Sequence, residues 1–300
     1  MGMYKDSGVN LQEARKLTGK LFEVTSDNCL KDFTGSAEFG NIKIFNCCDG
    51  IGTKIIPLYE RKMYKTIAID LTAANLNDMA TKDIKAICFC DYIAVNKLES
   101  EAVLNIILEL KQILKTCNCK LIGGETSEMR TVLKDGKMDI SGFATGIGTS
   151  ETQPIVSGDV IIGLKSSGIH SNGFSLIGKL YGEKKLTAEE FEECLIPSYI
   201  YYNVLRKLWE QRLIKSGANI TGGGIIENLS RIVDIKKCEL FWKNIPEMNI
   251  YKRLKQLTGN EVYDVFNCGV GFCIIADKKN RENIFEVCKE FSPFEFGRVK

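Results

Sequence analysis

Four acidic segments in the first half of the chain place a carboxylate beside glycines or at the end of a predicted element. They are D-G-I-G-T-K at 49–54, Ile69-Asp70, Asn77-Asp78 and G-G-E-T at 123–126. Magnesium takes oxygen ligands and usually shares its coordination shell with nucleotide phosphates. Carboxylates that converge from several loops therefore suit an ATP site, in which Lys54 and the glycine amides could hold phosphate oxygens.

Each of these acids also has an ordinary structural use. Asp49 in a D-G pair suits a turn, Asp70 a helix cap, Asp78 a solvated helix surface and Glu125 a first helical turn. Taken singly, these uses are commoner than metal binding. Their occurrence together in one half of the chain favours a metal–nucleotide site, but the spacing leaves both interpretations open.

Two glycine-rich junctions in the second half are candidates for binding an anion. One is S-S-G-I-H-S-N-G at 166–173, after a predicted strand, and the other is T-G-G-G at 221–224, before a predicted helix. Free amides at a helix start attract phosphate, although ordinary tight turns explain the same glycines equally well. Neither junction matches the P-loop or the Rossmann pattern.

His170 is the only histidine of the chain. A centre with several histidine ligands is therefore excluded, and no G-x-S-x-G pattern accompanies His170 to indicate a serine hydrolase. Its polar, glycine-rich surroundings favour a ligand or proton-transfer role over a packed core histidine.

Composition excludes several classes of function. A chain of 300 residues predicts two domains, and a formal net charge of +2 is too small for non-specific nucleic-acid binding. No apolar stretch approaches the roughly 20 residues needed to cross a bilayer, so we expect no membrane association. The twelve cysteines contain no C-x-x-C pair and indicate reduced, buried thiols in a cytoplasmic protein.

Short apolar runs alternate with segments of helical period, which predicts a mixed α/β fold. Strands are expected at 43–47, 66–69, 86–89, 120–122 and 140–148, and a helix at 100–116 capped by Ser100. Asp70 is expected at a strand-to-helix junction. After a link at 149–154, where we place the domain boundary, strands are expected at 159–164 and, as the last one, at 270–276. Helices are expected at 174–180, near 191 and 205, and at 225–233.

The order of these segments resembles that of aminoimidazole ribonucleotide synthetases, also called phosphoribosylformylglycinamidine cyclo-ligases. The resemblance spans nearly the whole chain, and Y-K-D-S-G-V at 4–9, S-S-G-I-H-S-N-G at 166–173 and F-N-C-G-V-G at 266–271 are its most specific parts. D-G-I-G-T-K and G-G-E-T occur in looser form in related ATP-binding families. These include formylglycinamidine ribonucleotide synthase, selenophosphate synthetase and thiamine-monophosphate kinase.

The resemblance implies an α/β (α+β) protein of two domains, each a mixed sheet with helices. Residues 1–150 would bind ATP and Mg²⁺ and form a homodimer through a β-barrel, and residues 151–300 would carry the substrate loops. The reaction would close the imidazole ring of formylglycinamidine ribonucleotide through a phosphorylated formyl oxygen, releasing ADP and phosphate.

The resemblance also implies roles for particular residues. His170, Asp49 and Lys54 would be catalytic, and the metal ligands would be Asp49, Asp70, Asp78 and Glu125. Cofactor binding would involve Lys5, Asp6, Gly50, Gly52, Thr53, Asp70, Asn77, Asp78, Gly123, Gly124, Glu125 and Thr126. Substrate binding would involve Ser167, Gly168, Ser171, Asn172, Gly222, Gly223 and Gly224.

The chain departs from the family pattern in places, and other functions stay open. It is shorter than most members near 35–41 and 180–195, and Cys47-Cys48 precedes Asp49 where a small hydroxyl residue is usual. A thiamine-phosphate kinase or a selenophosphate synthetase is the main alternative enzyme, although Cys29, the earliest cysteine, lacks the glycine-rich setting of a reactive one. A non-catalytic nucleotide-binding protein is the alternative of a different class.

Overall fold

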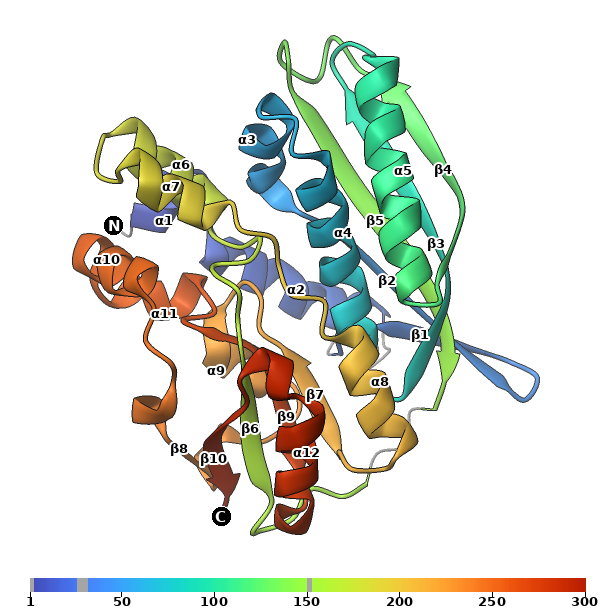
Figure 1. Cartoon of the computed structure of the whole chain (residues 1–300), viewed down its shortest axis with the longest axis vertical. Helices are drawn as coiled ribbons and strands as arrows, with labels where there is room; N and C mark the ends of the chain where they lie inside the picture. The colour runs from blue at the N-terminus through green and yellow to red at the C-terminus, as the bar shows by residue number, and fades with distance from the viewer. Residues whose placement is uncertain (1–2, 26–31, 150–152) are drawn as a thin grey trace.

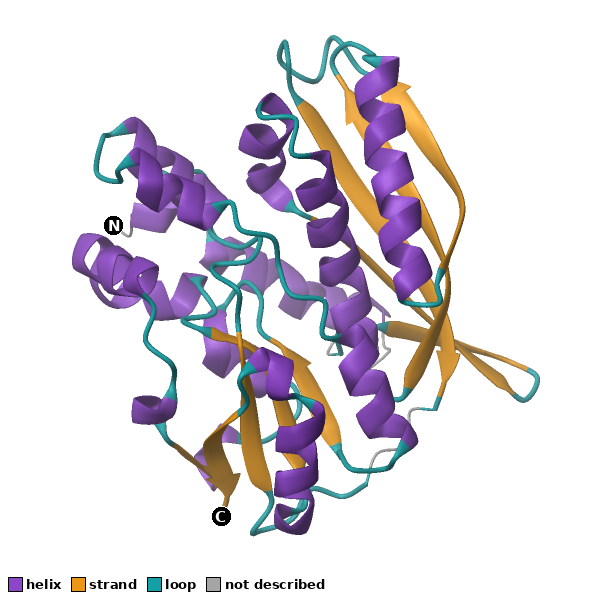
Figure 2. Cartoon of the chain, in the orientation of Figure 1, coloured by secondary structure: helices purple, strands orange, loops and turns teal. Residues whose placement is uncertain are grey.

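The computed structural model describes residues 3–25, 32–149 and 153–300. Its strands form two five-stranded sheets, with helices packed against them (Figures 1 and 2). The first sheet comes from residues before the predicted link and the second from residues after it. Ser150, Glu151 and Thr152 of that link, and Cys29, lie outside the described residues, and the division into two domains at this point stays a prediction.

The first sheet has the order β1-β2-β5-β3-β4, in which only the β3–β4 pair is parallel. Its strands are β1 Gly35–Phe39, β2 Ile42–Gly50, β3 Ile84–Val95, β4 Lys120–Glu128 and β5 Met138–Gly148. The helices of this half are α1 Met3–Asp6, α2 Leu11–Thr25, α3 Ile55–Glu60, α4 Tyr64–Met79 and α5 Ser100–Thr116. Helices α4 and α5 lie side by side along one face of the sheet (Figure 1).

The amphipathic helix predicted at 100–116 is confirmed with the same bounds. Val103, Ile106, Leu110 and Leu114 are buried along one stripe, as the helical period requires. The predicted cap is wrong, because Glu99 occupies the N-cap position and makes no side-chain capping hydrogen bond.

The strand predicted at 66–69 is also wrong, since these residues lie inside α4. This helix is buried on nearly all sides between the first sheet and the second half of the chain, so its apolar residues show no amphipathic period. A short apolar run of this kind cannot be assigned to strand or helix by periodicity. As a result, Asp70 lies in the middle of a helix and not at a junction.

The second sheet has the order β7-β9-β6-β10-β8, with every pair antiparallel. Its strands are β6 Val160–Lys165, β7 Ser216–Asn219, β8 Cys238–Leu240, β9 Val270–Ala276 and β10 Phe294–Val299. The helices are α6 Phe174–Gly182, α7 Ala188–Cys194, α8 Tyr202–Glu210, α9 Gly224–Leu229, α10 Asn249–Thr258, α11 Val262–Val265 and α12 Arg281–Val287.

The strand predicted at 270–276 is confirmed as β9, but it is not the last strand, because β10 follows it. The helix predicted at 225–233 ends early, at Leu229. The larger of two clusters of buried hydrophobic residues spans both sheets, since Ile140 of β5 and Phe272 of β9 both belong to it. Within the described residues, no helix is long and apolar enough to span a membrane.

Candidate functional site

A cavity of about 350 Å³ lies where the end of β2 meets the loops of the second half. This volume suits a small-molecule ligand. Its walls combine polar side chains with glycine backbone. The lining residues are Tyr4, Val9, Asp49, Gly50, Ile51, Gly52, Thr53, Ala73, Ala74, Asn77, His170, Ser171, Asn172, Gly173, Phe174, Ser175, Ser198, Asn219 and Thr221.

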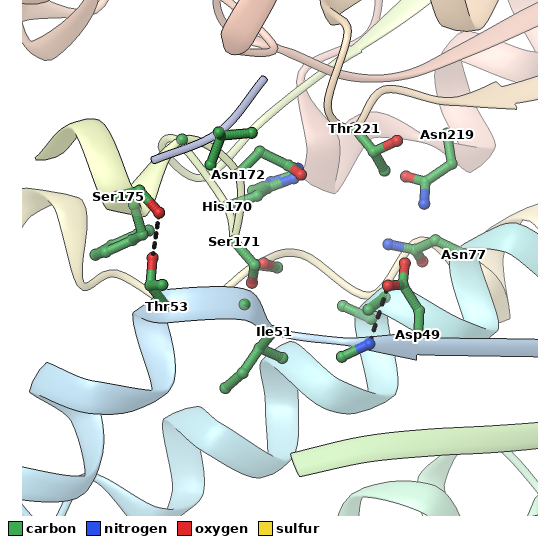
Figure 3. Close-up of a pocket in the computed structure, with 18 of the residues that line it drawn as sticks. Asp49, Ile51, Thr53, Asn77, His170, Ser171, Asn172, Ser175, Asn219 and Thr221 are labelled. Atoms are coloured by element: carbon green, nitrogen blue, oxygen red, sulfur yellow. Dashed lines mark hydrogen bonds between the residues drawn. The ribbon is translucent and has the colours of Figure 1, made fainter. Parts of the chain in front are cut away.

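The first wall begins at Asp49, near the end of β2. The Asn75 side chain of α4 fixes the Asp49 backbone, because its Oδ1 accepts from the Asp49 amide (3.1 Å) and its Nδ2 donates to the Asp49 carbonyl (3.1 Å). The Asp49 carboxylate accepts from the Gly50 amide (2.9 Å) and faces the cavity (Figure 3). The chain then turns through Gly52, whose φ of 55° favours glycine, into a short 3-10 helix.

The acidic end of the cavity is lined by one carboxylate and two amides, and a second carboxylate, Asp78, is partly buried next to it. Figure 3 shows the side chains of Asp49, Asn77 and Asn219 pointing toward one another. Behind them, Asn219 Nδ2 donates to Asp78 Oδ1 (2.8 Å). Burial raises the pKa of Asp49 to about 6. Burial also raises the pKa of Asp78 to about 8, with a smaller contribution from the Asp49 charge, although the Asn219 hydrogen bond opposes this shift.

His170 lies on the opposite wall, in the loop at 166–173. It adopts a left-handed backbone conformation (φ 58°), which is uncommon for a residue with a side chain. Its Nε2 accepts a long hydrogen bond from the Ser167 amide (3.4 Å). Burial, with a contribution from the Lys54 charge, lowers the pKa of His170 to about 3. His170 is therefore neutral near pH 7 and is no source of positive charge.

Hydroxyl groups surround the rest of the cavity. Thr53 Oγ1 and Ser175 Oγ lie 3.2 Å apart and join the two walls (Figure 3). The Ser171 hydroxyl is buried and forms no hydrogen bond within the described part of the chain. A buried hydroxyl in a cavity wall is suited to bind a polar ligand group. Asn172 also lines the cavity, whereas Ser167 and Gly168, two other predicted substrate residues, do not.

Lys54 and Asp70 lie outside the cavity lining and form a buried ion pair. Their side chains are fully buried, and Lys54 Nζ lies 2.8 Å from Asp70 Oδ2. The predicted metal ligand Asp70 is therefore already paired with a cation, and neither residue lines the cavity.

The segment Gly123–Thr126 lies inside the exposed edge strand β4, so Glu125 is not the acid of a first helical turn, which was the alternative structural use considered for it. Strands β5 and β3 separate β4 from β2, which places Glu125 roughly 14 Å from Asp49 at the usual strand spacing. Among the residues that the structure describes, no group of three or more acidic, histidine or cysteine side chains is placed to hold a metal ion. Of the four predicted metal ligands, the fold brings together only Asp49 and Asp78.

The turn Gly222–Gly224 leads from Thr221, in the cavity wall, into the six-residue helix α9. Gly223 and Gly224 have positive φ angles of 91° and 72°. A Cβ on Gly224 would lie 1.9 Å from the Tyr263 carbonyl oxygen, so both the backbone conformation and the close approach require glycine there.

The N-terminal segment runs beside the cavity, with Tyr4 and Val9 in its lining. The Glu261 carboxylate accepts from the backbone amides of Met3 (3.0 Å) and Tyr4 (3.3 Å) and so fastens α1 to the second half. Asp6 is exposed, and the side chain of Lys5 lies outside the described part.

Several lining residues were absent from the residues assigned by sequence. Ser175 follows a predicted glycine-rich loop, and Thr221 is part of the T-G-G-G segment, so a sequence motif next to each residue indicated its place in the site. Asn219 and Ser198 had none, because Asn219 ends the short unpredicted strand β7 and Ser198 lies in a segment without regular structure.

Comparison with known proteins agrees with this architecture. Residues 37–148 match the family "AIR synthase related protein, N-terminal domain", and residues 156–299 match the corresponding C-terminal domain. The phosphoribosylformylglycinamidine cyclo-ligase of Thermoanaerobacter pseudethanolicus is 36% identical over 311 residues, covering 94% of this chain and 92% of that protein.

Two solved structures have a similar fold at low identity. The thiamine monophosphate kinase of Aquifex aeolicus aligns with a TM-score of 0.67 at 17% identity, covering 97% of this chain and 96% of that one. The hydrogenase maturation protein HypE in complex with ATP aligns with a TM-score of 0.65 at 14% identity, covering 88% and 78%. The fold is common to these proteins, but the extensive sequence identity is to the cyclo-ligase: this chain belongs to the AIR synthase related family, among the enzymes named phosphoribosylformylglycinamidine cyclo-ligase.

Proposed function

We propose that this chain closes the imidazole ring of aminoimidazole ribonucleotide, using ATP to activate formylglycinamidine ribonucleotide. The observation that carries the proposal is one cavity with two unlike walls. One wall presents Asp49 and Thr53, and the other presents the loop of His170 and Ser171. In a chain 36% identical to a cyclo-ligase, this arrangement suits a nucleotide on the first wall and a polar substrate on the second.

The acidic end of the cavity fits Mg²⁺. Asp49 and Asp78 are two carboxylates with raised pKa values, and a divalent cation would favour the charged form of both. We assign Mg²⁺ to these two residues, with Asp49 as the residue that lines the cavity. The ion would neutralise charge on the phosphates of ATP. ATP use agrees with the fold, because a structural neighbour is described as a complex with ATP.

The proposed reaction has two steps. The formyl oxygen attacks the γ-phosphorus of ATP, the bond to the β,γ-bridging oxygen breaks, ADP leaves, and the formamide nitrogen loses its proton to form a carbon–nitrogen double bond. A nitrogen of the amidine then attacks the former formyl carbon, the carbon–oxygen bond breaks, and phosphate leaves with that oxygen while the nitrogen loses a proton. Phosphorylation is required because the oxygen is a poor leaving group before it.

The protein itself would hold the two reactants in the orientation that the reaction requires and prevent other orientations of them. The Ser171 hydroxyl is free to bind substrate, and neutral His170, whose Nε2 accepts from the Ser167 amide, can donate one hydrogen bond from Nδ1 but brings no charge. Assay of ATP consumption with formylglycinamidine ribonucleotide, thiamine phosphate and selenide as separate acceptors tests the assignment, because a kinase acting on thiamine phosphate would consume ATP without releasing phosphate. ATP consumption with the first acceptor alone, accompanied by phosphate release, supports it. Consumption with another acceptor would move the chain to a related activity, and ATP binding without consumption with any acceptor would favour a non-catalytic protein.

The pH dependence of the reaction should follow the two proposed Mg²⁺ ligands. Their pKa values are raised to about 8 for Asp78 and about 6 for Asp49, so falling pH protonates first Asp78 and then Asp49 and weakens the affinity for Mg²⁺. We expect kcat/KM for MgATP to fall about tenfold per pH unit below pH 8 and more steeply below pH 6. His170, whose pKa is lowered to about 3, does not titrate there. The His170→Asn variant should therefore keep the same acid limb in a pH–rate profile; a limb that disappears in this variant would assign the titration to His170.

We also propose that the chain forms a homodimer through the first sheet. The face of this sheet opposite α4 and α5 carries apolar side chains that are 40 to 62% exposed, namely Ile87, Ile122, Phe143 and Ile147. Such a patch on a sheet suits burial against a second copy.

Phe143→Lys should therefore convert a dimer to a monomer in sedimentation velocity, because a charge would be buried at the interface. Leu104→Lys is the matched control, since Leu104 is 57% exposed on α5 and lies away from that face. A wild-type monomer at micromolar concentration, or an unchanged Phe143→Lys dimer, would contradict the dimer proposal.

A further inference from the structure

Three oxygens of the protein surround the Lys54 ammonium group. Its Nζ donates to the backbone carbonyls of His170 (2.9 Å) and Ile196 (2.9 Å) and forms an ion pair with Asp70, whose Oδ2 lies 2.8 Å away. Two of its three protons are therefore donated to carbonyls, and its charge is neutralised by Asp70, which accepts no hydrogen bond at Oδ2 from the described residues. The Lys54 side chain is also fully buried.

The three acceptors belong to three separate segments. Asp70 lies in α4, which packs on the first sheet; His170 lies in the substrate loop; and Ile196 lies in the segment that follows α7. Asp70 Oδ1 also accepts from the Ser198 amide (2.7 Å), and farther along α4 Asn77 binds the same segment at Tyr199 and Tyr201. One buried charge therefore joins the first half of the chain to two segments of the second.

Both of these segments contribute to the cavity wall. His170 and Ser198 line it, opposite Asp49 and Thr53. A buried ion pair is not in itself a strong source of stability, because desolvation offsets the attraction. It does impose one spatial arrangement, since moving any of the three segments would leave a buried charge or carbonyl without its partner.

We propose that Lys54 is a positioning residue that sets the separation of the two cavity walls and does not contact ATP. The inference rests on the proposed function, in which ATP binds one wall and the phosphoryl acceptor binds the other. In-line transfer of the phosphoryl group requires the two walls to hold ATP and the acceptor at the correct distance and orientation. A displacement of about 1 Å between the two ligands can lower the rate about 100-fold.

The double variant Lys54→Met/Asp70→Asn tests this role. It removes both charges together, so no unpaired ion stays buried, and the amide oxygen introduced by Asp70→Asn can still accept from the Ser198 amide. The matched control is Lys215→Met/Asp159→Asn, which removes the second buried ion pair, with 2.8 Å between Lys215 Nζ and Asp159 Oδ1, from a site outside the cavity lining.

We expect the Lys54/Asp70 variant to bind MgATP within about twofold of wild type and to lose roughly 100-fold in kcat/KM for formylglycinamidine ribonucleotide. Amide hydrogen exchange at 168–172 should accelerate in this variant and not in the control. A tenfold weaker affinity for MgATP with unchanged exchange would show that this pair contacts MgATP directly and overturn the proposal. Wild-type exchange and turnover would overturn it as well. The binding and exchange results decide the question even if the wild-type protein does not use this substrate.

A measurement on the unmodified protein covers the case in which the variant does not fold. Acetic anhydride labelling with mass spectrometry should leave Lys54 unreacted both with and without MgATP, because its amine is buried and bonded. Labelling of Lys54 in the free protein together with protection by MgATP would contradict the positioning role.

Discussion

The Asp49→Asn variant should lose more than about 100-fold in kcat/KM for MgATP. Asp49 is the carboxylate that faces the cavity, and an amide cannot replace its charge on Mg²⁺. The fold should persist, because the Asp49 backbone, and not its carboxylate, bonds to Asn75. Thermal stability without Mg²⁺ should be equal or higher, since the neutral amide removes a charge whose burial raises the pKa of Asp49 to about 6.

Isothermal titration with MgATP and steady-state kinetics measure this effect. The control is Asp135→Asn, which makes the same chemical change at an exposed turn and should leave affinity and turnover unchanged. Wild-type affinity and turnover in Asp49→Asn would show that Mg²⁺ is held elsewhere.

The Gly224→Ala variant should lower the free energy of unfolding by roughly 2 to 4 kcal/mol. The methyl group would lie 1.9 Å from the Tyr263 carbonyl oxygen, and alanine is strained at a φ of 72°. The turn that contains Thr221 would shift, so substrate affinity should also fall. This result would show that Gly224 is needed for the backbone conformation of the turn, whether or not its neighbours bind an anion.

Gly178→Ala is the matched control for this substitution. Gly178 is exposed in α6, and a Cβ there would meet no atom within 4 Å. Alanine favours the helix, so this variant should gain about 0.5 to 1 kcal/mol. Urea denaturation of both variants gives the comparison. Equal stability of Gly224→Ala and wild type would mean that the turn relaxes without cost.

The sequence predicted local features best where one physical cause dominates. The amphipathic period of α5 and the apolar run of β9 indicated their bounds directly. The helix α4 was missed in part because its burial on nearly all sides removes the period on which the prediction depends. Strands β7 and β8 are too short for a pattern to form.

The candidate site was predictable as a set of segments but not as an arrangement. Asp49, Thr53 and the His170 loop were named, and the fold brings them to one cavity. No sequence pattern indicates that Lys54 and Asp70 neutralise each other in the core, or that Glu125 is separated from Asp49 by two strands. These outcomes depend on contacts between residues of different elements, which no local spacing encodes.

The most direct test of the proposed reaction follows the formyl oxygen. Formylglycinamidine ribonucleotide labelled with ¹⁸O in the formyl group is incubated with MgATP, and the released phosphate is analysed by mass spectrometry. If the oxygen is phosphorylated before ring closure, each phosphate released with aminoimidazole ribonucleotide carries one ¹⁸O. Phosphate without the label, or no release of phosphate with this substrate, would contradict the proposed function.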